Sequence, residues 1–295
     1  SVDNLYLYGC KRFKMNVNSI CVCGAGTMGS GIAQAFAQAG FYTILYDNTP
    51  AMLKMAKAGM EKNLQSITEK GKIKAGEKEK ILQRIYFTDD IQVCQADIFI
   101  EAIIENPDIK IGLFNQLAEM NHSECIFATN TSSLSVTKIA AGVVNPQRLI
   151  GMHFFNPATI MTLVEVVNTE YTNAQTTQMV IELAKAMGKT PVLCKDSPGF
   201  IVNRVARPFY TESLRLAEEG IADFEQTDRL LEATGFRMGP FKLMDLIGID
   251  VNYAVSCSVY QQLNEPERLK PSFIQEEKVK EGKLGKKTGE GYYRY

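Results

Sequence analysis

The sequence is poor in histidine, with His122 and His153 as the only two in 295 residues. A zinc site would therefore depend on cysteine pairs, and the single close pair, Cys21 and Cys23, falls inside an expected strand. We therefore expect no metal site. The same scarcity leaves two imidazoles that could transfer a proton near neutral pH.

The sequence also lacks a basic excess and a long apolar run, and its cysteines are scattered. The 32 Lys and Arg are balanced by 33 Asp and Glu, so the chain lacks the basic excess of proteins that bind nucleic acid or an anionic membrane. Glu101 interrupts the most apolar stretch, residues 98–104, and no run reaches the roughly 18 residues that cross a bilayer. The seven scattered cysteines favour a reducing compartment, and we expect a cytoplasmic protein. Residues 1–14 lack the charge order of a signal peptide and are interpreted as an extension.

Short β-rich runs alternate with longer amphipathic runs up to about residue 196, which is typical of a parallel sheet with crossover helices. From residue 197 the β-rich runs stop, and glycines at 220, 235 and 239 separate successive helical stretches. We predict a mostly parallel α/β domain over 15–196, followed by an all-helical domain over 197–295. The expected strands are 20–23, 43–46, 98–102, 125–129, 149–153, 163–167 and 191–194, and the expected helices are 28–39, 50–69, 76–84, 108–120 and 173–187.

An inserted helical hairpin is expected over residues 50–84. Its 54–84 part carries nine Lys or Arg against four Glu. Two interpretations stay open, because surface helices are often rich in Lys and Glu. The hairpin is either a solvated face or a binding surface for a phosphorylated ligand.

A glycine-rich loop directly follows the first expected strand and opens a helix. Gly24 permits the tight turn, Gly26 lets a pyrophosphate approach the backbone, and Gly29 lets helix and strand touch. Asp47, at the end of the second strand, can accept hydrogen bonds from an adenosine ribose and would repel a 2′-phosphate. The pattern predicts a Rossmann-type domain that binds NAD rather than NADP, and the alternative for Asp47 is an ordinary strand-end aspartate. The loop residues are Gly24, Ala25, Gly26, Thr27, Met28 and Gly29.

Seven further motifs follow the glycine loop in order: EAIIEN (101–106), NTSSLSV (130–136), HFFNP (153–157), LVEVV (163–167), KDSPGFIVNR (195–204), GPFKLMDLIG (239–248) and GKKTGEGYYRY (285–295). With these motifs the chain resembles the L-3-hydroxyacyl-CoA dehydrogenase family, including its bacterial 3-hydroxybutyryl-CoA dehydrogenases, from about residue 16 to the end. The resemblance implies NAD-dependent interconversion of (S)-3-hydroxyacyl-CoA and 3-oxoacyl-CoA, with short acyl chains preferred. It also implies a homodimer formed by the helical domain.

Oxidation of a secondary alcohol needs a base, and His153 is the better candidate because it ends an expected strand. His122 lies in a polar run after a helix and is expected to be a solvated loop residue. Glu165 lies inside an apolar strand, so a buried carboxylate there needs a partner. By resemblance that partner is His153, which Glu165 would orient, and a structural salt bridge is the alternative.

The resemblance assigns roles to further residues. Ser132 would hydrogen-bond the substrate oxygen near the nicotinamide, although its loop could equally cap a helix. Asn203 would polarise the reacting oxygen, and its alternative is a capping or interdomain residue. The expected cofactor contacts also include Glu105, Lys110, Asn156 and Lys287. Lys70 would contact coenzyme A, and Asn63 stands where mammalian members have a serine that makes such a contact.

Two rival functions remain on the sequence alone. One is a sister dehydrogenase of a free hydroxy or sugar acid, and the basic hairpin argues against it. The other is a non-catalytic nucleotide-binding sensor, and the presence of all four expected catalytic residues argues against that. Those residues are Ser132, His153, Glu165 and Asn203.

Overall fold

The computed structural model describes residues 17–74 and 76–295, so the expected extension 1–14 lies outside the described residues. The described chain divides into two compact units. The first runs to Asn130 and continues over Val136–Leu193, and the second comprises Thr131–Ser135 and Cys194–Tyr295.

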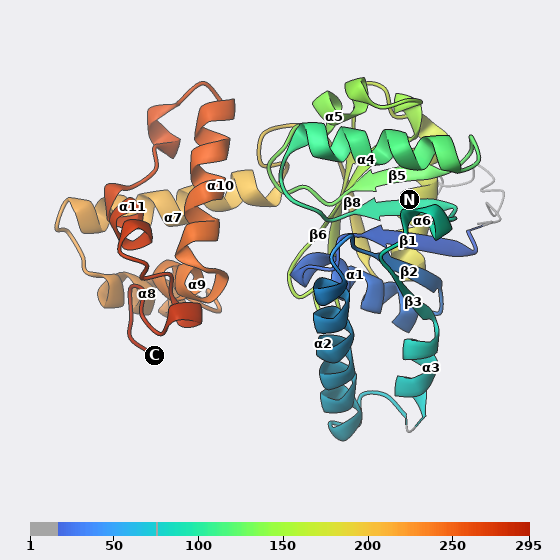
Figure 1. The fold of residues 1–295 in the computed structure, drawn as a ribbon. Coiled ribbons are helices and arrows are strands. Elements are labelled where there is room, and N and C mark those ends of the chain that lie inside the picture. The colour runs from blue at the N-terminus through green and yellow to red at the C-terminus, as the bar shows by residue number, and fades with distance from the viewer. Residues whose placement is uncertain (1–16, 75) are drawn as a thin grey trace, which may run out of the picture. The chain divides into compact units, whose positions relative to one another are not determined.

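The first unit is built on an eight-stranded sheet with the order β3-β2-β1-β4-β5-β6-β7-β8 (Figure 1). The pairings from β3 to β6 are parallel, whereas β6 and β7 are antiparallel. The predicted mostly parallel α/β fold is therefore confirmed. The strands are β1 Ser19–Cys23, β2 Tyr42–Tyr46, β3 Ile85–Thr88, β4 Ile98–Glu101, β5 Ile126–Thr129, β6 Leu149–Phe154, β7 Leu163–Asn168 and β8 Thr190–Lys195.

Six α-helices connect these strands. The helices α2 and α3 project from the sheet as a hairpin (Figure 1). The sequence does not predict β3 or α5, because each is short and lacks a long periodic pattern. The helices are α1 Thr27–Gln38, α2 Pro50–Glu69, α3 Glu77–Gln83, α4 Pro107–Met120, α5 Val136–Gly142 and α6 Ala174–Ala186.

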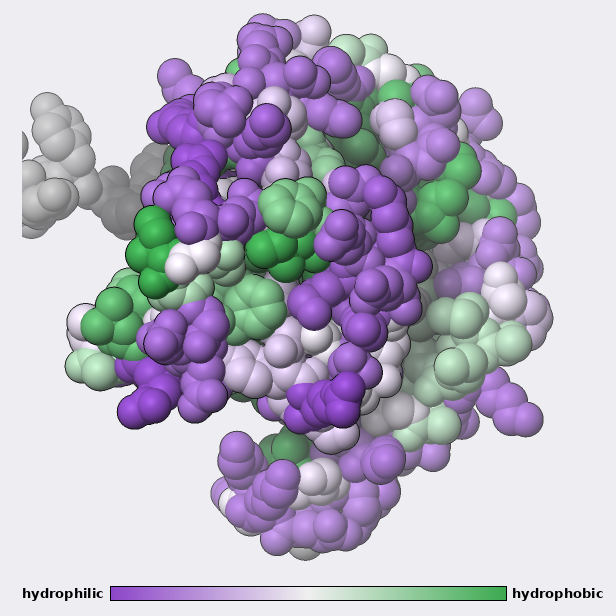
Figure 2. Space-filling model, turned by 90° about the vertical axis from the view of Figure 1, so that its left-hand side faces the viewer, coloured by the Kyte–Doolittle hydropathy of each residue, from purple (hydrophilic) through white to green (hydrophobic). Residues whose placement is uncertain are grey.

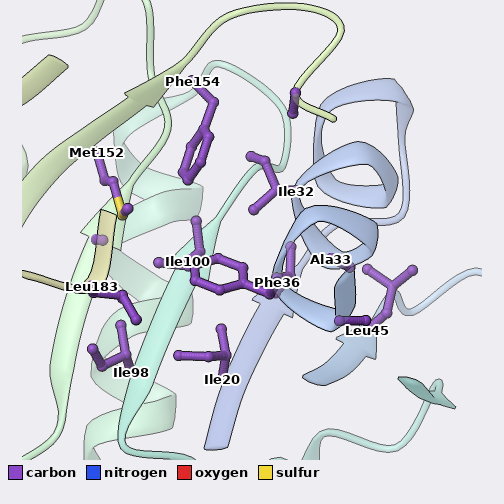
Figure 3. Close-up of a cluster of buried hydrophobic side chains, with 14 of the residues drawn as sticks. Ile20, Ile32, Ala33, Phe36, Leu45, Ile98, Ile100, Met152, Phe154 and Leu183 are labelled. Atoms are coloured by element: carbon purple, nitrogen blue, oxygen red, sulfur yellow. The ribbon is translucent and has the colours of Figure 1, made fainter. Parts of the chain in front are cut away.

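The two faces of the sheet have separate layers of buried side chains. Alternate residues of β1 and β4, such as Ile20 and Ile100, face a core that includes Phe36 of α1 and Leu183 of α6 (Figure 3). On the other face Phe99 and Phe127 stack with ring centroids 5.6 Å apart, and Phe114 of α4 lies 5.4 Å from Phe127. Because side chains alternate along a strand, residues two positions beyond Phe99 and Phe127 face α4 as well.

The second unit is mostly helical. Its core gathers Tyr210, Leu214, Phe241, Met244 and Tyr292, so the last residues of the chain pack against α7 and α9. The breaks expected at glycines 220, 235 and 239 lie where α7 ends, where α8 ends and where α9 begins. The helices are α7 Val202–Glu218, α8 Phe224–Ala233, α9 Pro240–Ile247, α10 Ile249–Gln262 and α11 Phe273–Lys280. Within residues 17–74 and 76–295, no helix is long and apolar enough to cross a membrane.

Candidate active site

The glycine loop joins β1 to α1 at the carboxyl edge of the sheet. Gly24 has φ +104°, and a Cβ on it would lie 2.6 Å from the carbonyl oxygen of Ala102. A Cβ on Gly29 would lie 1.7 Å from the carbonyl oxygen of Gly24. A Cβ on Gly26, in contrast, would meet no described atom within 4 Å. Backbone packing therefore requires glycine at positions 24 and 29. Gly26 leaves the surface of the loop open at the start of α1.

Asp47 follows β2 and is bonded to this loop. Its Oδ2 accepts a hydrogen bond of 2.7 Å from the backbone N–H of Ala25, and its Oδ1 accepts one of 2.9 Å from Thr49. These contacts fix the carboxylate beside the loop, where it can accept hydrogen bonds from ribose hydroxyl groups. The loop and Asp47 therefore fit a dinucleotide, with the pyrophosphate at the helix N-terminus.

A buried ion pair lies at the ends of β4 and β5. Glu101, fully buried, accepts hydrogen bonds from the Lys110 ammonium, from the Thr129 hydroxyl at 2.7 Å and from the Ile103 backbone N–H at 2.8 Å. Lys110 is 1% exposed and also lies 3.0 Å from Oε2 of Glu105, whose side chain is 40% exposed. Burial raises the pKa of the Glu101 carboxyl, and the contacts with Lys110 and Thr129 offset part of that effect.

The catalytic pair expected from the sequence is brought together. His153 and Glu165 face each other in the antiparallel register of β6 and β7. The Nδ1 atom of His153 lies 2.7 Å from Oε2 of Glu165, and both residues are buried. A carboxylate can hold Nδ1 protonated, which leaves Nε2 as the atom that can accept or donate a proton at a substrate.

These groups share one face of the sheet. Glu101 is in register with Thr129, and Thr129 with Gly151. His153 lies two residues beyond Gly151 on the same strand, so its side chain points to the same face as that of Glu101. The residue that follows β5 also contacts this strand, because the side-chain oxygen of Asn130 accepts a 2.8 Å hydrogen bond from the Phe154 N–H.

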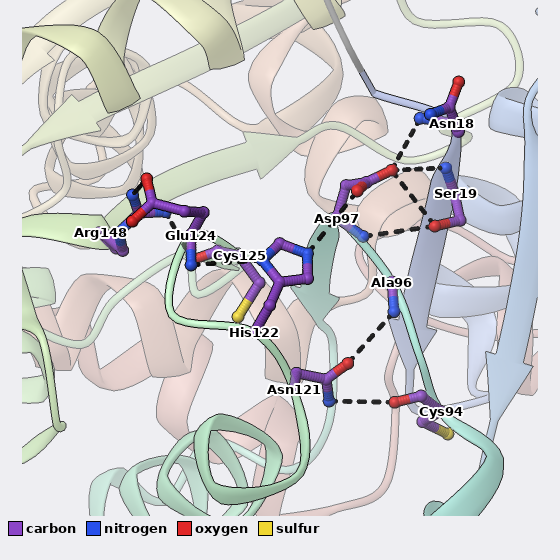
Figure 4. Close-up of polar contacts among 10 residues, drawn as sticks. All are labelled: Asn18, Ser19, Cys94, Ala96, Asp97, Asn121, His122, Glu124, Cys125 and Arg148. Carbon is purple, nitrogen blue, oxygen red and sulfur yellow. Dashed lines mark hydrogen bonds and ion pairs between the residues drawn. The ribbon is translucent and has the colours of Figure 1, made fainter.

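His122 lies at the opposite edge of the sheet, in the loop between α4 and β5. Its Nε2 is 3.7 Å from Oδ1 of Asp97, and its Nδ1 accepts a 3.2 Å hydrogen bond from the Glu124 N–H (Figure 4). The ring is 53% exposed. The structure therefore places His122 in a solvated loop before the amino end of β5, away from the carboxyl edge that carries His153.

Two expected site residues lie together in the second unit. The Asn203 side chain donates a 3.4 Å hydrogen bond to the carbonyl oxygen of Ser132. The Ser132 segment is also held by Gln262, which donates a 2.7 Å bond to the carbonyl oxygen of Ser133. Arg207 donates to the carbonyl oxygen of Asn203 at 3.0 Å. These contacts fix Ser132 relative to the first turn of α7.

The remaining predicted contacts are dispersed. Lys70 caps α2 at the exposed tip of the hairpin, and the side-chain oxygen of Asn63 accepts a 2.8 Å hydrogen bond from Gln34. Asn156 is exposed directly after β6. Lys287, in the second unit, is paired with Asp250 at 2.6 Å. The roles predicted for these residues stay predictions.

Glu101 and Thr129 were not predicted as site residues. The signal for Glu101 was present, since it is a carboxylate in an apolar strand and so needs a buried partner, as Glu165 does. No comparable signal exists for Thr129, because threonine is common in strands.

Two family models match the chain. The 3-hydroxyacyl-CoA dehydrogenase NAD binding domain matches residues 19–197, and the 3-hydroxyacyl-CoA dehydrogenase C-terminal domain matches residues 199–295.

Individual proteins are similar along nearly the whole chain. The chain is 46% identical to the 3-hydroxyadipyl-CoA dehydrogenase of Escherichia coli, with 95% of this chain aligned to 59% of that longer protein. It is 41% identical to a probable 3-hydroxybutyryl-CoA dehydrogenase of Deinococcus radiodurans, with 93% of this chain and 99% of that protein aligned. The crystal structure of an (S)-3-hydroxybutyryl-CoA dehydrogenase from Ralstonia eutropha has a TM-score of 0.90 at 36% identity, covering 95% of this chain and 99% of that one.

Proposed function

The chain belongs to the 3-hydroxyacyl-CoA dehydrogenase family, and from this membership we propose that it interconverts (S)-3-hydroxyacyl-CoA and 3-oxoacyl-CoA with NAD. Short acyl chains such as 3-hydroxybutyryl are the proposed substrates, since the probable 3-hydroxybutyryl-CoA dehydrogenase of Deinococcus radiodurans aligns over nearly its full length. The observation that carries the proposal is the buried His153–Glu165 pair, in the same sheet as a glycine loop that fits a dinucleotide.

His153 is the proposed acid–base residue. In the oxidation direction its Nε2 accepts the proton of the substrate hydroxyl, and in the reduction direction it returns that proton. Glu165 keeps Nδ1 protonated, directs Nε2 away from the β7 strand and stabilises the imidazolium that forms. Removal of the proton makes the alkoxide carbon a better hydride donor, and bound NAD supplies the hydride acceptor.

The cofactor is held by the first unit. The backbone N–H groups at the start of α1 would bind the pyrophosphate, and Asp47 would accept hydrogen bonds from the ribose hydroxyl groups. Glu105, Lys110 and Asn156 follow β4 and β6 at the same carboxyl edge and are the proposed contacts nearer the nicotinamide. Lys287 of the second unit is proposed as a further contact.

The substrate contacts are proposed from both units. Ser132 and Asn203 would donate hydrogen bonds to the reacting oxygen, and their mutual contact supports a shared role. Lys70 and Asn63, on the basic hairpin, would contact coenzyme A, whose phosphates are anionic. We propose residues 15–196 as the NAD-binding domain and 197–295 as the domain for substrate binding and dimerisation.

A homodimer is proposed from apolar surface in the second unit. Leu246, Ile247 and Val251, in α9 and α10, are exposed, whereas Phe241 and Met244 belong to the core. Figure 2 shows hydrophobic residues that reach the surface in patches among hydrophilic ones. Light scattering of the purified protein at micromolar concentration tests this, with twice the 32.8 kDa chain mass expected. The scattered thiols favour a cytoplasmic location.

One assay tests the proposed reaction. NADH oxidation is followed with acetoacetyl-CoA and, in parallel, with free acetoacetate. Fast turnover of the thioester with negligible turnover of the free acid supports the proposal. Equal activity on the free acid would instead favour a sister dehydrogenase, and no turnover of either compound would favour a nucleotide-binding sensor.

A further inference from the structure

The second unit contains a buried arginine to which the proposed mechanism assigns no role. Arg207, in α7, is 3% exposed. Its Nε donates a 3.0 Å hydrogen bond to the backbone carbonyl oxygen of Asn203. Its Nη1 donates to the carbonyl oxygen of Asn252 at 3.0 Å and to the hydroxyl of Ser256 at 2.9 Å, and the guanidinium lies 4.9 Å from the centroid of the Tyr210 ring. Neutral groups of α7 and α10 therefore hold this side chain.

The charge of Arg207 has no counter-ion, since no carboxylate among the described residues pairs with its guanidinium. Burial lowers the pKa of Arg207 to about 10, so the side chain is still charged at neutral pH. A fully buried arginine is normally paired with a carboxylate, because an unpaired charge in the interior is costly. Hydrogen bonds to neutral oxygens stabilise the guanidinium but do not cancel its charge. Its positive potential therefore reaches the neighbouring groups.

The neighbour one helical turn away is Asn203, a proposed substrate contact. Its backbone oxygen accepts the hydrogen bond from Arg207, and its side-chain amide donates to the carbonyl oxygen of Ser132 at 3.4 Å. The amide nitrogen has a second N–H that can be donated to the reacting oxygen of the substrate. One turn of helix and the length of the side chains put that oxygen on the order of 10 Å from the guanidinium. All three residues belong to the second unit.

We propose that Arg207 is a positioning residue that holds Asn203 and places an uncompensated positive potential at the oxygen bound by Asn203 and Ser132. The inference rests on the proposed function and extends it by one residue. The reacting oxygen is neutral in both the alcohol and the ketone and carries negative charge between them, so the potential lowers the barrier without tightening substrate binding. Burial strengthens this effect, because solvent screens an exposed arginine.

A counter-ion placed beside Arg207 tests this role while the arginine stays in place. Ser256→Asp puts a carboxylate where the hydroxyl now accepts the hydrogen bond from Nη1, so the link between α7 and α10 is kept and the charge is cancelled. Ser256→Asn is the matched control, because it has nearly the same shape and no charge. Arg215→Met, a second control, removes from α7 an arginine that is already paired with Glu212. Steady-state kinetics with NADH and acetoacetyl-CoA and thermal denaturation are measured on the full chain.

The expected result is a loss of rate without a loss of binding or stability. Ser256→Asp lowers kcat about tenfold, the scale of one charge interaction over about 10 Å at an effective dielectric constant near 20. KM for acetoacetyl-CoA stays nearly unchanged, and the denaturation midpoint is no lower than that of Ser256→Asn. Both controls keep a near-normal kcat.

A kcat of Ser256→Asp equal to that of Ser256→Asn would overturn the inference and leave Arg207 as a structural link between two helices. If Ser256→Asp does not fold, the pair Arg207→Met and Arg207→Lys decides. The uncharged variant is expected to lose kcat and the charged variant to regain most of it, whereas equal rates of the two would overturn the inference. A wild-type protein that does not turn over acetoacetyl-CoA would overturn the proposed function itself.

Discussion

His153 and Glu165 face each other across two antiparallel strands, with Nδ1 and Oε2 2.7 Å apart in the interior of the first unit. The strand pairing sets this contact, because residues directly opposite in an antiparallel pair bring their side chains together on one face. Both side chains project from strands and not from a loop. The imidazole is therefore oriented before a substrate binds, which is what an acid–base residue requires.

Replacement of Glu165 by Gln tests that pair. The substitution removes the negative charge beside the imidazole and nearly preserves the shape, so the imidazolium becomes less favourable and the acid limb of kcat/KM moves to lower pH. The maximal rate falls by about 10²–10⁴-fold, as expected for loss of an orienting carboxylate. NAD binding, measured by calorimetry, stays nearly unchanged. An unshifted acid limb with a near-normal rate would contradict the assignment.

Replacement of Asp47 by Ala tests the adenosine side of the cofactor site. The carboxylate is fixed by hydrogen bonds from the backbone N–H groups of Ala25 and Thr49, and it is expected to accept hydrogen bonds from the ribose hydroxyl groups. Its loss weakens NAD binding by about 1–3 kcal/mol, the scale of hydrogen bonds to a charged group. It also relaxes discrimination against NADP, because the repulsion of a 2′-phosphate disappears. Equal wild-type affinity for NAD and NADP would be incompatible with this role.

The basic hairpin is tested by ionic strength. If Lys70 and its neighbours bind the phosphates of coenzyme A, salt raises KM for acetoacetyl-CoA more steeply than KM for the acetoacetyl thioester of pantetheine, which lacks those phosphates. The comparison is made in sodium chloride between about 0.05 and 0.5 M, where the Debye length falls several-fold. Parallel responses of the two substrates would leave the hairpin as a solvated surface.

The pH dependence of stability tests the environment of Glu101. Burial raises the pKa of its carboxyl, so the folded protein retains a proton that the unfolded chain releases. This contribution to stability is fully present below the unfolded-state value of about 4.3 and is lost as the pH rises through the folded-state value. Glu101→Gln lacks that loss, so relative to wild type it gains unfolding free energy as the pH rises above about 4.3. Urea denaturation at several pH values measures the difference, and the opposite trend would mean that Lys110 outweighs burial.

Much of the site follows from the sequence because its signals are local. The glycine loop is determined by backbone geometry within six residues, and Asp47 by its place directly after an apolar strand. His153 is the candidate base because, of the two histidines in the chain, it is the one expected at the end of a strand. Helix breaks at glycine and proline were equally local, and the structure places them where expected in the second unit.

Tertiary structure decided which distant residues meet. The apolar run LVEVV predicts that Glu165 is buried within a strand, but it does not determine which strand lies beside it or in which direction that strand runs. The antiparallel register of β7 with β6 supplies both answers. The sequence likewise indicates that a buried Glu101 needs a partner. Only the packing of α4 on that face of the sheet shows that this partner is Lys110. The physical reason is that periodicity specifies how a side chain points, whereas long-range packing specifies what it points at.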